Sequence, residues 1–411
     1  MVDELFWFAM GLTACLAGSI AFLGVRRYVY IINPLLVFAT FQIGILTLLS
    51  AVAANGYNGG QKTGLTLVLL FSMVYMVGFT LLYLPRRLSF PRKLFDILLR
   101  IVGRNTVSPG YGGLSQLILI MIALILFFLL MQGSGAGMLW ITDPRQAYQS
   151  YRMGVGLNFV MVQWALLLSL VYYLWARKPR LVGVVFWVFV FSFAAYFTGS
   201  KASILSGVVV AGVYYYYCVR TIPTVLILSA PFLLIGVFLL LLLFQGSYSD
   251  FSSAISYFKD YTQTTATFLV RFDEFGLHWG SGMLSDLWFY VPRTLYPDKP
   301  FEYGVILIHK VLFPGAAAQG HTPGVLPWAL SYLDFGVVGV FFSGLLSGFI
   351  SRGAYESFLA NRSNILAFIL MIQLAILPVF IYATLPMIIV IAVFLALFMR
   401  KKIVFFASER Q

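Results

Sequence analysis

Long apolar runs separated by short polar stretches dominate the chain of 411 residues. An α-helix needs roughly 20 mostly apolar residues to cross the hydrocarbon core of a bilayer. Eleven segments of about this length stand out, within a range of ten to twelve, so the pattern predicts an all-α polytopic membrane protein. The predicted spans are Leu5–Leu23, Ile31–Ala54, Leu65–Leu84, Leu114–Met131, Asn158–Trp175, Leu181–Phe197, Ala202–Val219, Ile222–Phe244, Val337–Ile350, Ile365–Tyr382 and Pro386–Met399.

The composition excludes an ordinary soluble domain. Hydrophobic residues make up 61% of the chain and charged residues 10%, whereas soluble domains carry about 25% charged residues. The net charge of +13 does not indicate nucleic-acid binding, because the basic residues fall between the apolar runs. Cys15 and Cys218 both lie inside apolar runs, so they predict neither a disulfide framework nor a metal site.

The distribution of basic residues orients the predicted spans. Cytoplasmic loops of membrane proteins carry an excess of Lys and Arg. With the N-terminus outside, the inner loops hold 18 of the 27 basic residues, among them Arg352 and Arg362, and the opposite orientation reverses the ratio. The predicted topology is therefore N-out and C-in. The inner stretch from Arg92 to Arg104 alternates basic and apolar positions at helical spacing, which suits either a helix on the inner leaflet or a basic connector.

Polar chemistry concentrates in one outer segment. The chain divides into residues 1–244 with eight spans, the outer loop 245–336, and residues 337–411 with three spans and a cytoplasmic C-terminus. The loop holds all three histidines and eight of the fourteen acidic residues. Charged groups near a membrane usually line a substrate path, so the loop is the predicted functional site. The alternative is a solvated loop with an ordinary mixture of charges.

Two parts of this loop have distinct predicted structures. Residues Phe251 to Gly276 are rich in aromatic residues and poor in helix breakers, which predicts an amphipathic helix at the outer interface. Residues Val291 to Pro300, VPRTLYPDKP, contain three prolines. Because proline fixes its own φ and restricts the preceding residue, this stretch is predicted to be a stiff, non-helical arm.

The cations of the loop suit a polyanionic ligand. Arg271, Arg293 and Lys299 provide two guanidinium groups and an ammonium group, and guanidinium groups form bidentate hydrogen bonds with phosphate. The alternative is that Arg271 pairs with Asp273 or Glu274, and Lys299 with Asp298; surface pairs of this kind contribute little. No acidic cluster has metal-ligand spacing, so no metal and no cofactor are predicted.

Two residues are candidates for a general base, and three more for a cationic path. His321 lies between glycines and a proline, and its ordinary pKa is near neutrality. Glu274 is the second candidate. Lys201, Arg145 and Arg152 are outer basic residues that either extend the path towards an anionic headgroup or anchor helix ends by snorkelling.

Three stretches of this chain resemble the Wzy-type oligosaccharide repeat-unit polymerases, the O-antigen polymerases, which are relatives of the O-antigen ligases. The likeness rests on VPRTLYPDKP at 291–300, TGSKASIL at 198–205 and HTPGVLPWALSYLDFGVVG at 321–339, together with a large outer loop late in the chain. The chain departs from the family pattern at Lys201, where arginine is common. It also departs before Tyr332, where the family often has a glutamate, and it lacks an arginine followed sixteen positions later by glycine around Arg271 or Arg293.

The resemblance implies a GT-C-like fold in the bacterial inner membrane, with the active site facing the periplasm. It implies metal-independent glycosyl transfer that polymerises repeat units linked to undecaprenyl pyrophosphate, for O-antigen or another surface polysaccharide. Arg293 and the other cations would hold the departing pyrophosphate, and His321 would take the proton of the acceptor hydroxyl. Asp298 and Tyr332 lie in the matching stretches and are further candidates for substrate binding. Implied partners are the lipid-linked oligosaccharide, membrane lipids and a chain-length regulator, with no nucleic acid.

Two other functions remain open at this point. An O-antigen ligase, or another lipid-linked glycosyltransferase, shares the donor and the chemistry and differs in the acceptor. A transporter or flippase for lipid-linked glycans tends to show internal repeats and broken helices at the bilayer midplane, and neither is evident in this sequence. An intramembrane protease would need a histidine within a span, and no predicted span contains one.

Overall fold

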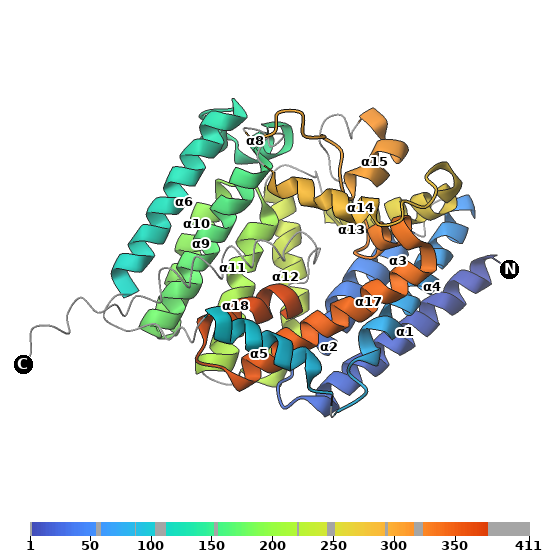
Figure 1. Cartoon of the computed structure of the whole chain (residues 1–411), viewed down its shortest axis with the longest axis horizontal. Helices are drawn as coiled ribbons and strands as arrows, with labels where there is room; N and C mark the ends of the chain where they lie inside the picture. The colour runs from blue at the N-terminus through green and yellow to red at the C-terminus, as the bar shows by residue number, and fades with distance from the viewer. Residues whose placement is uncertain are drawn as a thin grey trace, which may run out of the picture. The chain divides into compact units, whose positions relative to one another are not determined.

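The computed structural model describes residues 2–54, 59–86, 88–102, 112–151, 155–219, 222–244, 251–291, 295–315 and 324–376. Over these ranges the regular structure is helical and contains no strand, which confirms the all-α class (Figure 1). Three predicted site residues, Arg152, Arg293 and His321, lie outside the described ranges. The predicted span Pro386–Met399 also lies outside them.

Seven of the described helices are long and apolar enough to cross a membrane. This finding confirms a polytopic membrane protein and is compatible with further spans. Three shorter apolar helices, Leu181–Tyr196, Phe232–Leu241 and Ile365–Ile376, fall within other predicted spans. The seven helices are Val2–Arg27, Pro34–Ala54, Lys62–Leu81, Gln116–Ser134, Gly156–Arg177, Lys201–Val219 and Ala329–Ala360.

The chain forms two compact units, and each draws on separate stretches of sequence. The first unit comprises Met1–Leu88, Arg145–Leu157 and Ile222–Ile350, and the second comprises Ser89–Pro144, Asn158–Thr221 and Ser351–Gln411. The first unit therefore contains the whole of the predicted outer loop, residues 245–336. Helix α17 (Ala329–Ala360) contributes its first part to one unit and its last part to the other.

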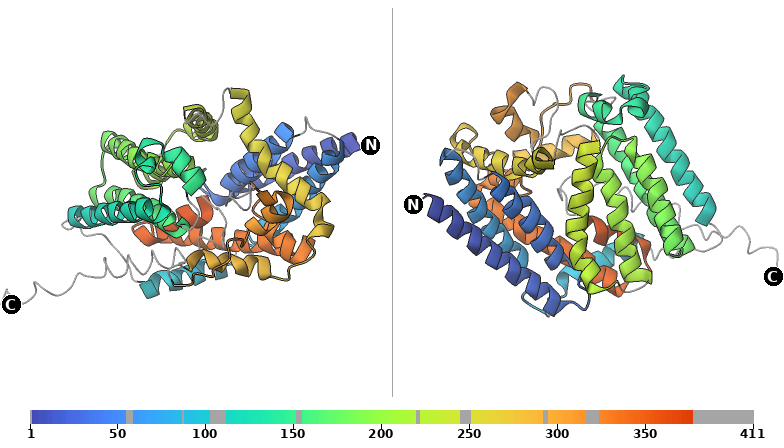
Figure 2. Two further views of the ribbon diagram at one scale, coloured as in Figure 1. Left: turned by 90° about the horizontal axis from the view of Figure 1, so that it is seen from above. Right: turned by 180° about the vertical axis from the view of Figure 1, so that it is seen from behind.

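The first unit is built around its N-terminal helices. Helices α1 (Val2–Arg27) and α4 (Gly59–Leu81) pack side by side (Figures 1 and 2). Phe38 stacks on Phe79 of α4 with ring centroids 3.8 Å apart. The remaining elements before the loop are α2 (Pro34–Val37), a π-helix at Phe38–Leu49, α3 (Ser50–Ala54), α8 (Pro144–Tyr151) and α12 (Thr224–Phe244).

Small residues let α17 approach α4 closely. A Cβ atom at Gly78 would collide with the backbone oxygen of Phe341, and a Cβ atom at Gly344 with that of Tyr75. Glycine permits such contacts because it has no side chain, and small residues commonly mark tight packing between membrane helices. The hydroxyl of Tyr75 also donates a hydrogen bond to the Ser347 hydroxyl at 3.0 Å. The start of α17 is therefore held firmly in the first unit.

The ninth predicted span differs from the structure in length. Helix α17 runs from Ala329 to Ala360, whereas the apolar run predicted Val337–Ile350. Gly336 has φ of 61° and ψ of −147°, so the helix bends where the apolar run begins. The prediction that Arg352 belongs to an inner loop is wrong, because Arg352 lies inside α17 with 1% of its surface exposed. Its ion pair with Glu356 explains how a charge is accommodated there, with Nε and Oε1 at 2.9 Å.

The described part of the predicted outer loop folds into one long helix and several short ones. The predicted amphipathic helix is confirmed as a helix, α13 (Phe251–Val270), and it packs against α3 and α4. The hydroxyl of Ser50 in α3 contacts the Thr262 hydroxyl of α13 at 2.7 Å. The described part of the arm contains no helix, as predicted. The other elements are 3₁₀ turns at Phe272–Glu274 and Asp286–Tyr290, α14 (Ser281–Ser285) and α15 (Ile306–Leu312).

The second unit contains the remaining helices. The basic stretch, for which a helix and a connector were both open, forms the helix α5 (Phe90–Val102). The side chain of Asp96 in α5 accepts hydrogen bonds from Ser357 Oγ at 2.7 Å and Asn361 Nδ2 at 3.2 Å, and so fastens α5 to the end of α17. The other elements are α6 (Gly112–Ser134), α7 (Leu139–Thr142), α9 (Gly156–Arg177), α10 (Leu181–Tyr196), α11 (Lys201–Tyr214), a π-helix at Tyr215–Val219, α18 (Ile365–Met371) and a π-helix at Ile372–Ile376.

Candidate functional site

Asp334 is a buried acidic residue near the start of α17. None of its surface is exposed. Its two carboxylate oxygens accept hydrogen bonds from the backbone N–H groups of Gly282 at 2.9 Å and Met283 at 2.8 Å, at the first turn of α14. A carboxylate that accepts such charge-assisted hydrogen bonds satisfies donors that the helix leaves unpaired. Asp334 therefore fixes α14 to the N-terminal part of α17.

Asp286 lies beside this connection and carries a second carboxylate. Burial raises its pKa, and the negative charge of Asp334 raises it further, to about 6. Among the described residues, none donates a hydrogen bond to the Asp286 carboxylate. A partly buried carboxylate beside a like charge and without a described donor is unusual, because such groups normally find partners. Perturbed groups of this kind are candidates for function.

The two ends of the arm meet at Asp286. The arm leaves the 3₁₀ turn Asp286–Tyr290, and the chain returns at Gly304, whose backbone N–H donates a hydrogen bond to Ser285 Oγ at 2.8 Å. Gly304 has φ of 58°, and a Cβ atom there would collide with Oδ1 of Asp286. Glycine is therefore required at this position, both for the left-handed backbone and for the close approach of the carboxylate.

Lys299 brings a predicted cation to the same arm. Its side chain is buried, and Nζ lies 5.0 Å from the centroid of the Tyr303 ring, which is within the range of a cation–π interaction. The neighbouring Asp298 is exposed. Trp288 and Tyr296 stack across the arm with centroids 5.4 Å apart. The arm thus carries a cation over Tyr303, the residue before Gly304, and the stacked pair Trp288 and Tyr296 offers flat aromatic surfaces.

Tyr290, on the same turn as Asp286, and Trp279, just before α14, have unusual surroundings. The hydroxyl of Tyr290 is buried and makes no hydrogen bond to a described residue. Burial and the charge of Asp286 raise its pKa to about 12. Trp279 has φ of 51° and 74% of its surface exposed, while its backbone N–H donates to the carbonyl of Asp334 at 3.0 Å. Strained, exposed side chains often mark binding sites.

Arg271 and Glu274 form a bidentate ion pair at the end of α13. Nε and Nη2 of Arg271 each lie 2.6 Å from an oxygen of Glu274. The side-chain hydrogen bonds raise the pKa of Arg271 and lower that of Glu274. Both side chains are exposed. One alternative reading of the sequence, in which Arg271 pairs with an adjacent acid, is thus confirmed, and the pair makes Glu274 a weak base.

Arg145 joins a second polar group made by α8 and α13. Its guanidinium carbon lies 5.2 Å from the centroid of the Tyr148 ring, and its charge acts on Tyr257 of α13. Tyr257 and Tyr261 share a hydrogen bond. Burial raises the pKa of the adjacent Asp260, and Lys259 opposes this rise. The cluster offers hydroxyls, a carboxylate and a guanidinium, which are groups that bind sugars and phosphates.

The closing stretch that carries His321 in the sequence runs along this second cluster. A Cβ atom at Gly324 would lie 3.4 Å from Cβ of Asp260. Leu326 N–H donates a hydrogen bond to Thr265 Oγ1 at 3.0 Å. The chain that follows His321 therefore reaches α13 beside Asp260. His321 itself lies outside the described residues.

Two other predicted site residues have different surroundings. Tyr332 packs among aromatic rings, with centroids 5.0 Å from Phe71 and 4.9 Å from Phe272. Lys201 belongs to the second unit, where it begins α11 with 6% of its surface exposed. Gly199, with φ of 65°, makes the turn that precedes it. Lys201 is thus a buried cation at the end of an apolar helix, which is a costly placement for a charge.

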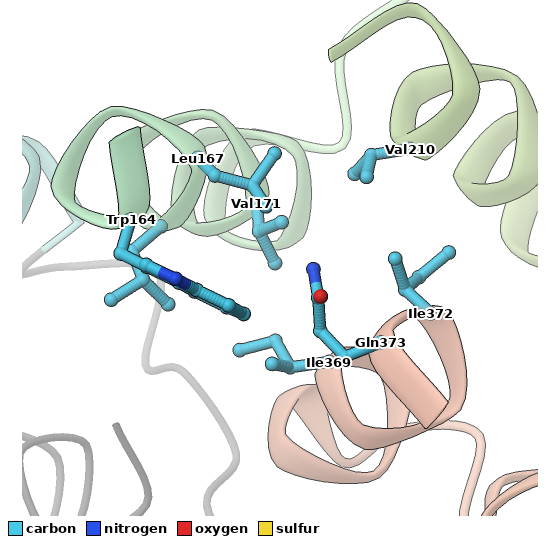
Figure 3. A pocket seen from close by; sticks show the side chains of 8 residues that line it. Trp164, Leu167, Val171, Val210, Ile369, Ile372 and Gln373 are labelled. Carbon is cyan, nitrogen blue, oxygen red and sulfur yellow. The ribbon is translucent and has the colours of Figure 1, made fainter. Parts of the chain in front are cut away.

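The described part of the chain contains no cluster of metal ligands, and the cavity drawn in Figure 3 is small. No three His, Cys, Asp or Glu residues gather there as metal ligands. A cavity in the second unit is lined by α9, α11 and the stretch Ile369–Gln373, and the amide of Gln373 points into it (Figure 3). Its free volume of about 10 Å³ holds one water molecule, so it does not accommodate a glycan or a lipid.

Two known proteins are similar to this chain in amino-acid sequence. Proteins named O-antigen polymerase from Salmonella typhimurium and Salmonella typhi are each 24% identical to this chain over 253 residues. The resemblance to the O-antigen polymerases is confirmed. The alignment covers 58% of this chain and 60% of each relative, so the chain matches less than two thirds of the length of these polymerases. No protein-family model matches the chain, and no solved structure matches it.

Asp286 and Asp334 were not among the sequence candidates. In the sequence they are two of eight acids in the loop, separated by 47 intervening positions, and nothing local distinguishes them. One signal was available for Asp334, because it is the acid directly before the ninth apolar run. An acidic residue at the end of a membrane helix is costly and therefore informative.

Proposed function

We propose that this chain polymerises oligosaccharide repeat units carried on a polyprenyl pyrophosphate, as a glycosyltransferase of a bacterial membrane. The single observation that carries the proposal is the similarity to two proteins named O-antigen polymerase. Seven apolar helices, together with a polar loop between two of them, suit an enzyme whose substrates are lipid-linked. We place the active site on the periplasmic face of the inner membrane, in an N-out and C-in chain with about eleven spans and a GT-C-like fold.

The proposed reaction moves a growing glycan onto the non-reducing end of a new repeat unit. The anomeric carbon of the donor loses its bond to the pyrophosphate oxygen and gains a bond to an acceptor hydroxyl. Negative charge develops on the departing pyrophosphate, and fixed cations stabilise this charge without reorganising. We assign this role to Arg293 and Lys299 on the arm, with Arg271, Arg145, Arg152 and Lys201 as further cations. No metal ion takes part in the reaction that we propose.

The acceptor hydroxyl must also lose a proton. His321 and Glu274 are the candidates from the sequence, and the structure pairs Glu274 with Arg271. Asp298, an exposed residue of the arm, and Tyr332 are proposed substrate contacts. The exposed ring of Trp279 and the stacked pair Trp288 and Tyr296 provide flat surfaces on which sugar rings pack. A chain-length regulator is a proposed protein partner.

The test is incubation of the purified protein with a lipid-linked repeat unit and a chelator, followed by gel electrophoresis. A ladder of products is expected. Addition of glycan to a lipid A acceptor without a ladder would support an O-antigen ligase, and transport without any new glycosidic bond would support a flippase. Either result would overturn the proposal.

The arginine of the arm provides a second test. Replacing Arg293 with Ala removes the proposed charge stabilisation, and loss of one such donor typically lowers the rate by 10²- to 10³-fold. Lys62→Gln is a matched control, because Lys62 pairs with Asp3 at the start of α4 and has no proposed role. A ladder of normal intensity from Arg293→Ala would exclude the role assigned to this residue.

A further inference from the structure

The glycosyl transfer proposed above needs a base next to the cationic arm, and the following inference rests on that proposed function. Sugar hydroxyls are weak acids, so a positioned proton acceptor accelerates their attack. Such a base must be ionised at the working pH, and its pKa should lie close to that pH. It must also be open enough to reach substrate and free of a strong competing partner.

Asp286 meets these geometric requirements. It lies at the root of the arm, where the chain leaves Tyr290 and returns at Gly304. Its side chain is partly exposed. None of the residues in the described ranges donates a hydrogen bond to it, and the glycine at 304 leaves room for the carboxylate. A hydroxyl of a bound acceptor would thus meet a carboxylate with open acceptor positions.

Asp334 holds this arrangement in place. Its carboxylate is fully buried and accepts hydrogen bonds from the N–H groups of Gly282 and Met283, so an acceptor hydroxyl does not reach it. These contacts fix α14, and Ser285 at the end of α14 binds Gly304. Asp334 therefore fixes the position of Asp286 through the backbone and acts on it through its negative charge.

Few charged groups face Asp286 in the described ranges. Asp334 on α17 and the buried hydroxyl of Tyr290 on the same turn both act on it electrostatically. Lys299 lies on the returning side of the arm, over Tyr303, one residue before Gly304. No described cation forms an ion pair with Asp286, whereas Glu274 is paired with Arg271 at 2.6 Å.

We propose that Asp286 is the general base of the glycosyl transfer and that Asp334 is its positioning residue. The Asp286 carboxylate takes the proton of the acceptor hydroxyl as the oxygen bonds to the anomeric carbon of the donor. The electron pair of the broken carbon–oxygen bond leaves with the polyprenyl pyrophosphate, which the cations of the arm hold. Asp286 then releases its proton to water and is ready for the next transfer.

Single-turnover rates of the purified protein on a lipid-linked repeat unit test this assignment. Asp286→Asn is nearly isosteric and cannot accept the proton, so the rate should fall by about 10²- to 10⁴-fold. Asp273→Asn is the matched control, because Asp273 is an exposed acid of the same loop with no role in the site, and its rate should stay unchanged. Thermal unfolding of each variant shows whether it folds.

The pH profile distinguishes a base from a structural residue. The wild-type rate should rise with pH through a midpoint of about 6, as Asp286 ionises. Asp334→Asn removes a negative charge and should move this midpoint to lower pH. His321→Asn should keep the midpoint of the wild type. A midpoint that disappears in His321→Asn, or a normal rate in Asp286→Asn, would overturn the proposal.

These outcomes separate this inference from the proposed function. If the wild-type protein makes a ladder and Asp286→Asn makes the same ladder, the polymerase function stands and the base lies elsewhere. If the folded wild-type protein makes no product, the proposed function fails first. Should Asp334→Asn fail to fold, the comparison of Asp286→Asn with His321→Asn still decides the assignment.

Discussion

Charged groups at the two ends of helix α17 have opposite kinds of surroundings. At the C-terminal end, within the second unit, Arg352 pairs with Glu356, and Asp96 accepts hydrogen bonds from Ser357 and Asn361. Each charge there meets a group of opposite charge or a hydrogen-bond donor. At the N-terminal end, within the first unit, Asp334 lies beside Asp286, so two groups of the same sign adjoin. Backbone N–H groups satisfy the carboxylate of Asp334, whereas that of Asp286 has no donor among the described residues.

This difference separates charges that support the structure from charges that are available for chemistry. A balanced, hydrogen-bonded pair is stable within a membrane helix, because each partner replaces the water that the other has lost. A carboxylate that is desolvated beside a like charge costs folding free energy. Such a cost persists where function requires it. The comparison therefore predicts that variants at the C-terminal end lose stability, while Asp286 variants lose activity and gain stability.

The largest loss of stability is expected at Arg352. Arg352→Met removes the cation that Glu356 pairs with, and breaking a buried pair typically costs about 3–5 kcal/mol. The thermal unfolding temperature of the detergent-purified protein measures the effect. The double variant Arg352→Met with Glu356→Leu removes both charges and should recover most of the loss. Equal losses in the single and double variants would show that the pair does not matter.

The next effect concerns the attachment of α5. Asp96→Ala deprives Ser357 and Asn361 of their acceptor, and an unpaired buried polar group costs about 1–3 kcal/mol. Arg92→Gln is the control, because it removes the other partner of Asp96 in an exposed pair, which contributes little. Faster proteolysis within residues 89–102 of Asp96→Ala than of Arg92→Gln would support the account. Equal rates for the two variants would contradict it.

A smaller effect with the opposite sign is expected at Tyr290. Its hydroxyl is buried without a partner in the described structure. Tyr290→Phe removes an unsatisfied polar group, so the free energy of unfolding should stay the same or rise by no more than about 1 kcal/mol. The thermal unfolding temperature measures this change. A marked loss of stability would mean that the hydroxyl has a partner that supports the fold.

The smallest effect is expected at Glu274. Glu274→Gln breaks an exposed ion pair, so thermal stability should not change measurably. The rate should not fall, because Arg271 becomes available to the pyrophosphate and Asp286 remains the base. A rate that falls to the level of Asp286→Asn would identify Glu274 as the base and refute the proposed role of Asp286.

Much of the fold followed from the sequence. Apolar runs predicted the membrane helices within a few residues, because hydrophobic length is set by bilayer thickness. The ninth span was the exception, because Gly336 and the polar residues around Asp334 interrupt the apolar pattern over the first turns of α17. At the other end of this helix, Arg352 was predicted to be a loop residue because it is charged. A buried ion pair lets a helix continue past a charge, and its partner could not be deduced from an apolar pattern.

The candidate site was less predictable. The arm and α13 followed from proline content and from aromatic spacing, and the pairing of Arg271 followed from local proximity. The contacts of Asp286 with Gly304 and Asp334 connect residues far apart in the chain. Only the folded structure shows which of eight acids in the loop come together.

The central claim is that Asp286 is kept in an unfavourable ionised state for function. An ordinary aspartate has a pKa of 3.8, and that of Asp286 is raised to about 6 in the folded protein. The folded state therefore binds the proton more tightly than the unfolded state, so stability should fall as pH rises from about 4 to 6, by about 3 kcal/mol in total.

The most direct test compares the thermal unfolding of wild-type protein and Asp286→Asn at pH values from about 4.5 to about 7.5. The rates of glycosyl transfer are measured at neutral pH. The account predicts that Asp286→Asn loses the fall in stability, unfolds at a higher temperature than wild type at neutral pH, and is inactive. A variant that is less stable than wild type at neutral pH, or that retains the same dependence on pH, would contradict it.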